Sequence, residues 1–107
     1  MMKKNIESKA IAAIEAHPMY IEARGYPHCA TELFVESTER IRKWRISEDV
    51  KDHILNKLSP ETSVILVTLQ TASKTPEPLS GTGKLYGFVL KPSTFELLHV
   101  DVGVWRS

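Results

Sequence analysis

The N-terminal half of the chain places its apolar residues at helical spacing. Between residues 5 and 16 they recur mostly three or four positions apart, and Pro18 stands just beyond, where a helix would end. A further helix is predicted to begin after Ser47, a residue type that caps helix N-termini, and to end before Pro60. Two acidic residues directly after Ser47 suit the positive end of the helix dipole. These segments predict a largely helical first half.

Residues 30–45 carry two conflicting signals. The run Leu33-Phe34-Val35 would suit a strand. Two acidic residues, however, each precede a basic residue by four positions, the favourable order on a helix surface: Glu36 with Arg40 and Glu39 with Lys43. Phe34, Ile41 and Trp44 would also share one helical stripe. We therefore predict a helix here.

The pattern changes to β after residue 61. The segment 62–71 is rich in β-branched residues and apolar on both faces, which is typical of a central strand. Two further strands are predicted at 84–90 and 94–105, and the polar segment 71–83 is predicted to be a flexible loop. This order predicts an α+β fold, with N-terminal helices packed on a small C-terminal antiparallel β-meander. At 107 residues, the chain fits a single domain over 1–107.

The last two predicted strands lack a polar face. A sheet with one solvated face should alternate apolar and polar residues, so something must cover the second face. The cover is either helices on both faces, or a second copy, a protein partner or a small ligand. Our main hypothesis is a non-enzymatic interaction module, a homodimer or a binder of a protein partner or small ligand. Its predicted binding surface is the aromatic sheet face: Tyr86, Phe88, Phe95, Leu97, His99 and Trp105.

Composition narrows the class of partner. The formal net charge is +1, so overall charge does not point to nucleic acid or an anionic membrane. The single cysteine, Cys29, excludes an intramolecular disulfide framework and suits a reducing compartment, so we expect a cytoplasmic protein. No apolar run reaches the length of a membrane span, and we expect no membrane partner.

The segment Arg24–Glu32, R-G-Y-P-H-C-A-T-E, holds the densest chemistry in the chain. If a helix begins just after it, Cys29 lies at the helix N-terminus, where the dipole favours the thiolate. His28 is a poor base for its own neighbour, so His99, oriented by Asp101, would have to come from the sheet. The alternative function is thus a small hydrolase or nuclease that uses His99 and Asp101 with Cys29 or His28. A structural role is the simpler interpretation, and we expect no enzyme.

The candidate nucleic-acid surface is a basic run: Arg40, Arg42, Lys43 and Arg45. Trp44 within it could stack on a base, which gives RNA or DNA binding as a further alternative. Two of the basic residues already have acidic partners at helical spacing, so we expect a solvated helix face instead. The four histidines and one cysteine lack zinc-type spacing, and residues 80–85 depart from phosphate-loop spacing. No metal and no cofactor are predicted.

Overall fold

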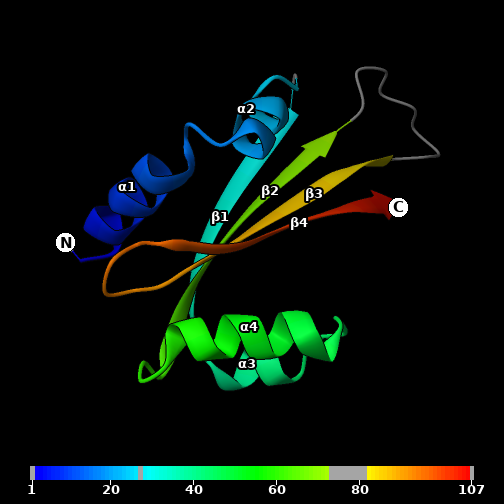
Figure 1. Ribbon diagram of the computed structural model, residues 1–107. Helices are drawn as coiled ribbons and strands as arrows, with labels where there is room; N and C mark the ends of the chain where they lie inside the picture. Colours follow the sequence, from blue (N-terminus) through cyan, green and yellow to red (C-terminus); the bar gives the residue numbers. More distant parts are fainter. Residues whose placement is uncertain (1, 27, 73–81, 107) are drawn as a thin grey trace.

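The computed structural model describes residues 2–26, 28–72 and 82–106 of the chain (Figure 1). In chain order its elements are α1 (Met2–Ile14), α2 (Pro18–Arg24), β1 (His28–Ser37), α3 (Glu39–Arg42), α4 (Glu48–Leu58), β2 (Ser63–Ala72), β3 (Thr82–Leu90) and β4 (Leu97–Arg106). The strands form one antiparallel sheet in the order β1-β2-β3-β4. The predicted α+β class is confirmed. The core of the predicted loop 71–83, residues 73–81, lies outside the described residues.

The helices divide between the two faces of the sheet. Figure 1 shows α1 and α2 on one side, and α3 and α4 on the other. The apolar cores agree with this arrangement: Ile14 of α1 and Ala23 of α2 pack on one face, and Ile41 of α3 and Ile54 of α4 pack on the other. Of the possible covers for two apolar faces, the chain thus supplies helices to both.

The prediction of a helix over residues 30–45 is wrong for most of its length. Residues His28–Ser37 form β1, which pairs with β2 along its whole length, and only Glu39–Arg42 is helical. Helical charge pairs contribute only about 0.2–0.5 kcal/mol each. Pairing with β2 instead satisfies a full ladder of backbone groups and packs Leu33 against the larger core. Tertiary pairing therefore overrides the local helical signal.

The two ion pairs predicted for that helix are only partly present. Arg40 lies 4.0 Å from Glu36, across the junction between β1 and α3. Glu39 pairs with Arg42 at 3.3 Å, rather than with Lys43. All of these side chains lie at the surface, where such pairs add little to stability.

Side-chain caps fix the starts of α2 and α4. Ser47 begins α4 as predicted, because its Oγ accepts a hydrogen bond from the backbone N–H of Val50 at 3.3 Å. A histidine does the same for α2: Nδ1 of His17 accepts from the backbone N–H of Met19 at 3.1 Å, with Pro18 in the first turn. Nδ1 can accept this hydrogen bond only while it carries no proton.

The α1/α2 side of the sheet is closed over the middle of β3. Tyr86 and Phe88 of β3 are 0% and 1% exposed. The rings of His17 and Tyr20 meet the Phe88 ring edge-on, with centroids 5.9 and 6.5 Å away. Two of the six residues predicted for an exposed binding face therefore lie inside the core of the chain itself.

One hydrogen-bond network fastens α2 to β3. The Tyr86 hydroxyl donates to the Glu22 carboxylate of α2, and the Lys84 ammonium lies 3.6 Å from the same carboxylate. The hydrogen bond from Tyr86, and then the charge of Lys84, hold the pKa of Glu22 below its usual range. Burial raises the pKa of Tyr86, and the hydrogen bond to Glu22 raises it further. The tyrosine therefore stays a neutral donor.

A bulge in β4 separates residues that strict alternation would place together. Leu90 lies opposite Leu97, but Val89, which precedes Leu90 in β3, lies opposite His99, so β4 contains one extra residue, Leu98. Leu97 packs into the α1/α2 core, whereas His99 turns to the α3/α4 side. The predicted continuous aromatic face is thus divided between the two sides of the sheet.

Candidate functional site

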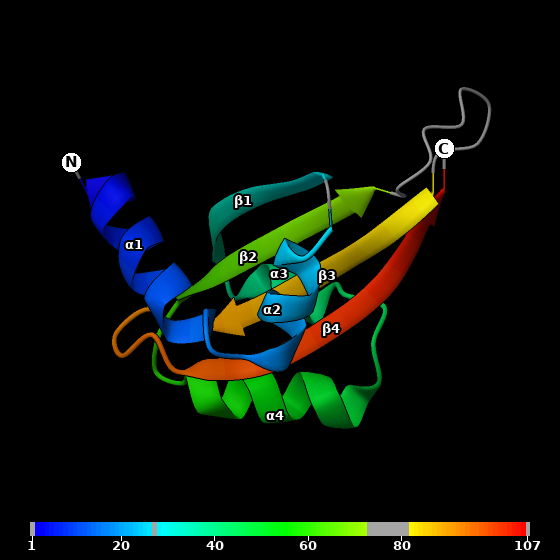
Figure 2. The same cartoon turned by 90° about the horizontal axis from the view of Figure 1, so that it is seen from above.

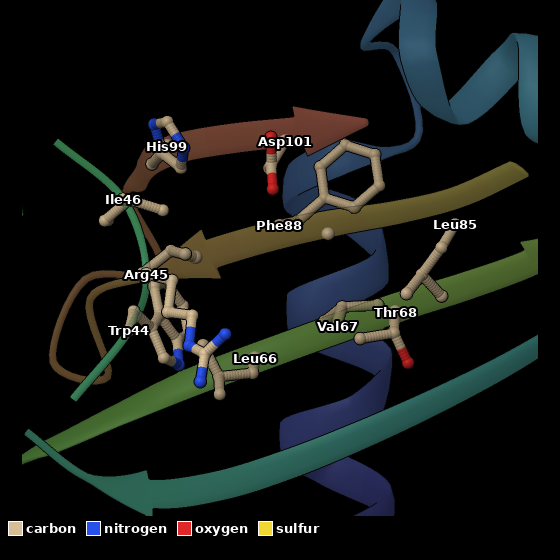
Figure 3. Close-up of a pocket in the computed structure, with 12 residues that line it drawn as sticks. Trp44, Arg45, Ile46, Leu66, Val67, Thr68, Leu85, Phe88, His99 and Asp101 are labelled. Carbon is tan, nitrogen blue, oxygen red and sulfur yellow. The ribbon is translucent and has the colours of Figure 1, made fainter. Parts of the chain in front are cut away.

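A pocket of about 280 Å³ lies on the α3/α4 side of the sheet. Figure 3 shows it between the segment that joins α3 to α4 and the surfaces of β2, β3 and β4. One wall consists of Trp44 and Ile46, and the sheet beneath contributes Leu66, Thr68 and Leu85. Most of this lining is apolar. The volume is close to the lower end of the range that small-molecule sites occupy.

The pocket exists because α3 and α4 cover only one end of this face. Their core gathers around Val64 and Val89, at the end of the sheet near α4. Further along the same face, β3 has a glycine, Gly87, opposite Asp101 of β4. A Cβ at Gly87 would approach nothing closer than 3.9 Å, so an alanine would fit there. Glycine weakens a strand interior, and its presence often marks close approach of a ligand or backbone.

The wall formed by residues 44–46 is anchored from α4. The Lys51 ammonium donates to the backbone carbonyl of Arg42 at 3.1 Å and lies 3.3 Å from the Glu48 carboxylate. Lys51 is only 9% exposed. Trp44 and Ile46 pack against the α3/α4 core beside this anchor. The wall is therefore tied to the rest of the molecule at its start and along its apolar side chains.

Polar groups stand at the rim of the pocket. His99 and Asp101 reach it from β4, and Arg45 reaches it from the α3–α4 segment (Figure 3). Within the part of the chain that the structure describes, no hydrogen bond or ion pair occupies these three side chains. They combine a cation, a carboxylate and an imidazole above an apolar floor. This arrangement can hold an apolar body and orient a polar group attached to it.

The predicted catalytic residues are not brought together. Cys29 lies on β1 and His99 on β4, the two opposite edges of the sheet. Three strand spacings separate these edges by about 14 Å. Cys29 also packs against the α1/α2 core, whereas His99 lines the pocket on the other side. His28 is exposed at the start of β1, so it too is remote from Asp101.

Cys29 also lacks the helix that its predicted reactivity required. It stands in β1, opposite Thr71 of β2, and not at a helix N-terminus. No helix dipole is therefore available there to favour a thiolate. Of the four residues in the enzyme hypothesis, the structure keeps only His99 and Asp101 side by side on one surface.

The remaining residues of the predicted aromatic face belong to different surroundings. Phe95 precedes β4 with a φ of 58° and packs at the edge of the α1/α2 core, with the Lys9 ammonium 6.0 Å from its ring centroid. Leu97 packs into the same core. Trp105 is in β4, and its side chain lies outside what the structure describes. Of the five whose side chains the structure describes, His99 and Phe88 line the pocket, although the Phe88 side chain belongs to the α1/α2 core.

The basic run of residues 40–45 does not form one surface. Arg40 and Arg42 pair with acidic neighbours, and Lys43 ends α3. Trp44 packs inward on the α3/α4 core, and Arg45 turns to the pocket. The described residues therefore present no continuous basic strip with an exposed stacking ring.

Comparison with known proteins gives no match: no family model, no curated protein and no solved structure matches this chain. Among the described residues, no group of three or more side chains is placed to hold a metal ion. No helix in the described part of the chain is long and apolar enough to cross a membrane.

Most of the pocket was missed from the sequence. Its wall comes from a segment predicted to be helical, and its floor from strands whose mutual register only the fold defines. One signal was present: Gly87 interrupts the apolar run of residues 85–90. A glycine inside a strand suggests a bulge or close approach to another group.

Proposed function

We propose that this protein is a binding module that holds a small, largely apolar molecule in the pocket between residues 44–46 and the sheet. The observation that carries the proposal is Gly87 in the middle of β3. Because Gly87 has no side chain, it leaves the floor of the pocket open, whereas β2 and β4 on either side contribute side chains to the same face. A valine or isoleucine there would be a better strand former, and the first carbon of its side chain would meet nothing closer than 3.9 Å. Glycine thus gives the strand less stability than valine or isoleucine would, but the space that it leaves can hold a ligand.

The lining defines the chemical class of the ligand. Trp44, Ile46 and Leu66 suit an aromatic or aliphatic ring. The volume of about 280 Å³ suits a molecule of two or three rings rather than a peptide or a nucleic-acid strand. Arg45 at the rim would pair with an anionic group on that ring, and His99 and Asp101 would supply further hydrogen bonds.

Filling the pocket from its floor tests the proposal. The probe is 8-anilino-1-naphthalenesulfonate, an anionic two-part aromatic dye whose fluorescence rises in apolar sites. We expect Gly87→Val to weaken dye binding by about tenfold or more, which corresponds to roughly 1.4 kcal/mol of lost binding free energy. The matched control is Ala30→Val, which adds bulk to an exposed position of β1 on the same sheet face, outside the pocket. The proposal is overturned if Gly87→Val binds the dye as tightly as the unchanged chain does. It is also overturned if Ala30→Val loses as much affinity as Gly87→Val.

A second variant tests the rim. Arg45→Gln should weaken the anionic dye several-fold and leave its uncharged relative, N-phenyl-1-naphthylamine, unchanged, because only the first has a group for the guanidinium. If both dyes lose affinity alike, Arg45 contributes packing and not charge.

A further inference from the structure

The second half of β4 is an exposed sheet edge that bears apolar residues. Four successive positions, 101–104, are exposed. Val102 and Val104 are 41% and 71% exposed, and both point to the α1/α2 side, because they lie opposite Tyr86 and Lys84 of β3. Exposed edge strands with unpaired backbone groups add further strands readily unless charges or cover blunt them.

The first half of the same strand is guarded. The bulge at Leu98 distorts it, and α4 lies beneath it, with Leu98 in the α3/α4 core. Figures 1 and 2 show the second half of β4 running away from α4 toward the C-terminal end. Any strand that joins this edge would therefore do so around residues 100–104.

The opposite edge of the sheet is different. β1 carries Glu32 and Glu36 along its length, and its exposed apolar residues, Phe34 and Val35, point to opposite faces. Between Val100 and Val104, β4 carries one charge, Asp101, on the pocket side. The α1/α2 side of that stretch is valine at every position.

Twofold symmetry then selects a register. We propose that two copies of this chain pair antiparallel along β4, centred on Val102. Val102 then lies opposite Val102 of the second copy, and Val100 lies opposite Val104 in both directions, so the exposed valines cover one another. On the pocket side Asp101 lies opposite Gly103, which leaves room for the carboxylate. Centring on Asp101 instead would place two carboxylates directly opposite, which is destabilising.

This pairing extends the pocket. His99 and Asp101 form its side on β4, at the edge of the sheet, and the strand of the second copy would continue the floor beyond that edge. The two pockets of the dimer would become neighbours across the symmetry axis. Pairing of about five residues buries less than a standard interface of about 800 Å² a side, so we expect a dissociation constant on the order of 10–100 µM.

Sedimentation equilibrium of the full chain without ligand, from about 5 to 500 µM, tests the dimer across that range of affinity. We expect Val104→Lys to raise the dissociation constant by about tenfold or more, since each dimer loses the contact twice. The matched control, Val35→Lys, places the same charge at the opposite edge, where the valine is 52% exposed, and should change nothing. A strict monomer throughout, or equal effects of the two variants, would overturn the proposal.

Disulfide trapping tests the register. In a Cys29→Ser background, Val102→Cys should form an intermolecular disulfide under mild oxidation, because position 102 meets itself. Val104→Cys should not, because the two 104 positions lie about 13 Å apart along the strands, beyond disulfide reach. Cross-linking at 104 and not at 102 would overturn this register. Because these measurements need no ligand, their outcome is independent of whether the pocket binds a small molecule.

Discussion

The two faces of the sheet differ in how completely the chain covers them. On the α1/α2 side, β3 contributes Tyr86 and Phe88, which are fully buried. On the α3/α4 side, the same strand contributes Leu85 and Gly87, which line an open pocket. Residues next to each other in sequence thus have opposite roles. The comparison teaches that alternate positions of one strand can meet different demands: one set of side chains builds the core, and the other set faces the pocket that we propose as a binding site.

The largest expected effect is the loss of a core aromatic from the closed face. Phe88→Ala should lower the free energy of unfolding by about 3–5 kcal/mol, because it leaves a cavity beneath α2. Leu85→Ala, three positions away on the open face, removes a side chain that is already 42% exposed and should cost less than about 1 kcal/mol. Urea denaturation of both variants measures the difference. Similar losses would show that the two faces contribute equally to stability.

A smaller effect is expected at the cap of α2, the helix that closes the first face. His17→Ala removes the acceptor for the backbone N–H of Met19 and should lower the free energy of unfolding by about 0.5–2 kcal/mol. His17→Asn keeps a capping acceptor and should recover most of that loss. Thermal unfolding of both variants measures the two losses of stability. A loss of equal size in both variants would assign the effect to the contact with Phe88 and not to the cap.

The smallest effect concerns the network at Glu22. Its pKa is lowered in the fold, so the carboxylate contributes stability that is fully present above its unfolded pKa and is lost as pH falls through the folded pKa. The stability advantage of the unchanged chain over Glu22→Gln should therefore shrink as the pH falls from neutral through 4.5, the ordinary pKa of a glutamate, and below it. Glu7→Gln, at an exposed position of α1, serves as the control. The prediction fails if the two differences follow the same pH profile.

The fold class followed from the sequence because its strongest signals are local. Ser47 and Pro60 bracket α4, and the run of residues 62–71 has the composition of the central strand that it forms. β1 was missed because its evidence is not local. The segment around Leu33 pairs with a strand some thirty residues later, and only that pairing outweighs two surface charge pairs.

The candidate site was harder to predict for a geometrical reason. His99 and Asp101 were identified as a pair on one face, and they do lie together at the pocket. Strict alternation along the strand places Phe95 and Leu97 on the same face as this pair. The bulge at Leu98 breaks that alternation, so the prediction of one shared face is wrong. Cys29 was assigned to them by chemistry alone, although the sheet places it at the far edge.

The bulge in β4 changes the face of the sheet to which the residues after it point. Residues 99–104 owe their faces to this one extra residue. If β4 paired regularly from Leu97 without the bulge, His99 would lie opposite Phe88 and would point to the α1/α2 side. A shift of register at this point would therefore alter the chemistry of the pocket more than most substitutions within it. In related chains, the register of β4 against β3 would be a better guide to a shared site than the identity of the residues after the bulge.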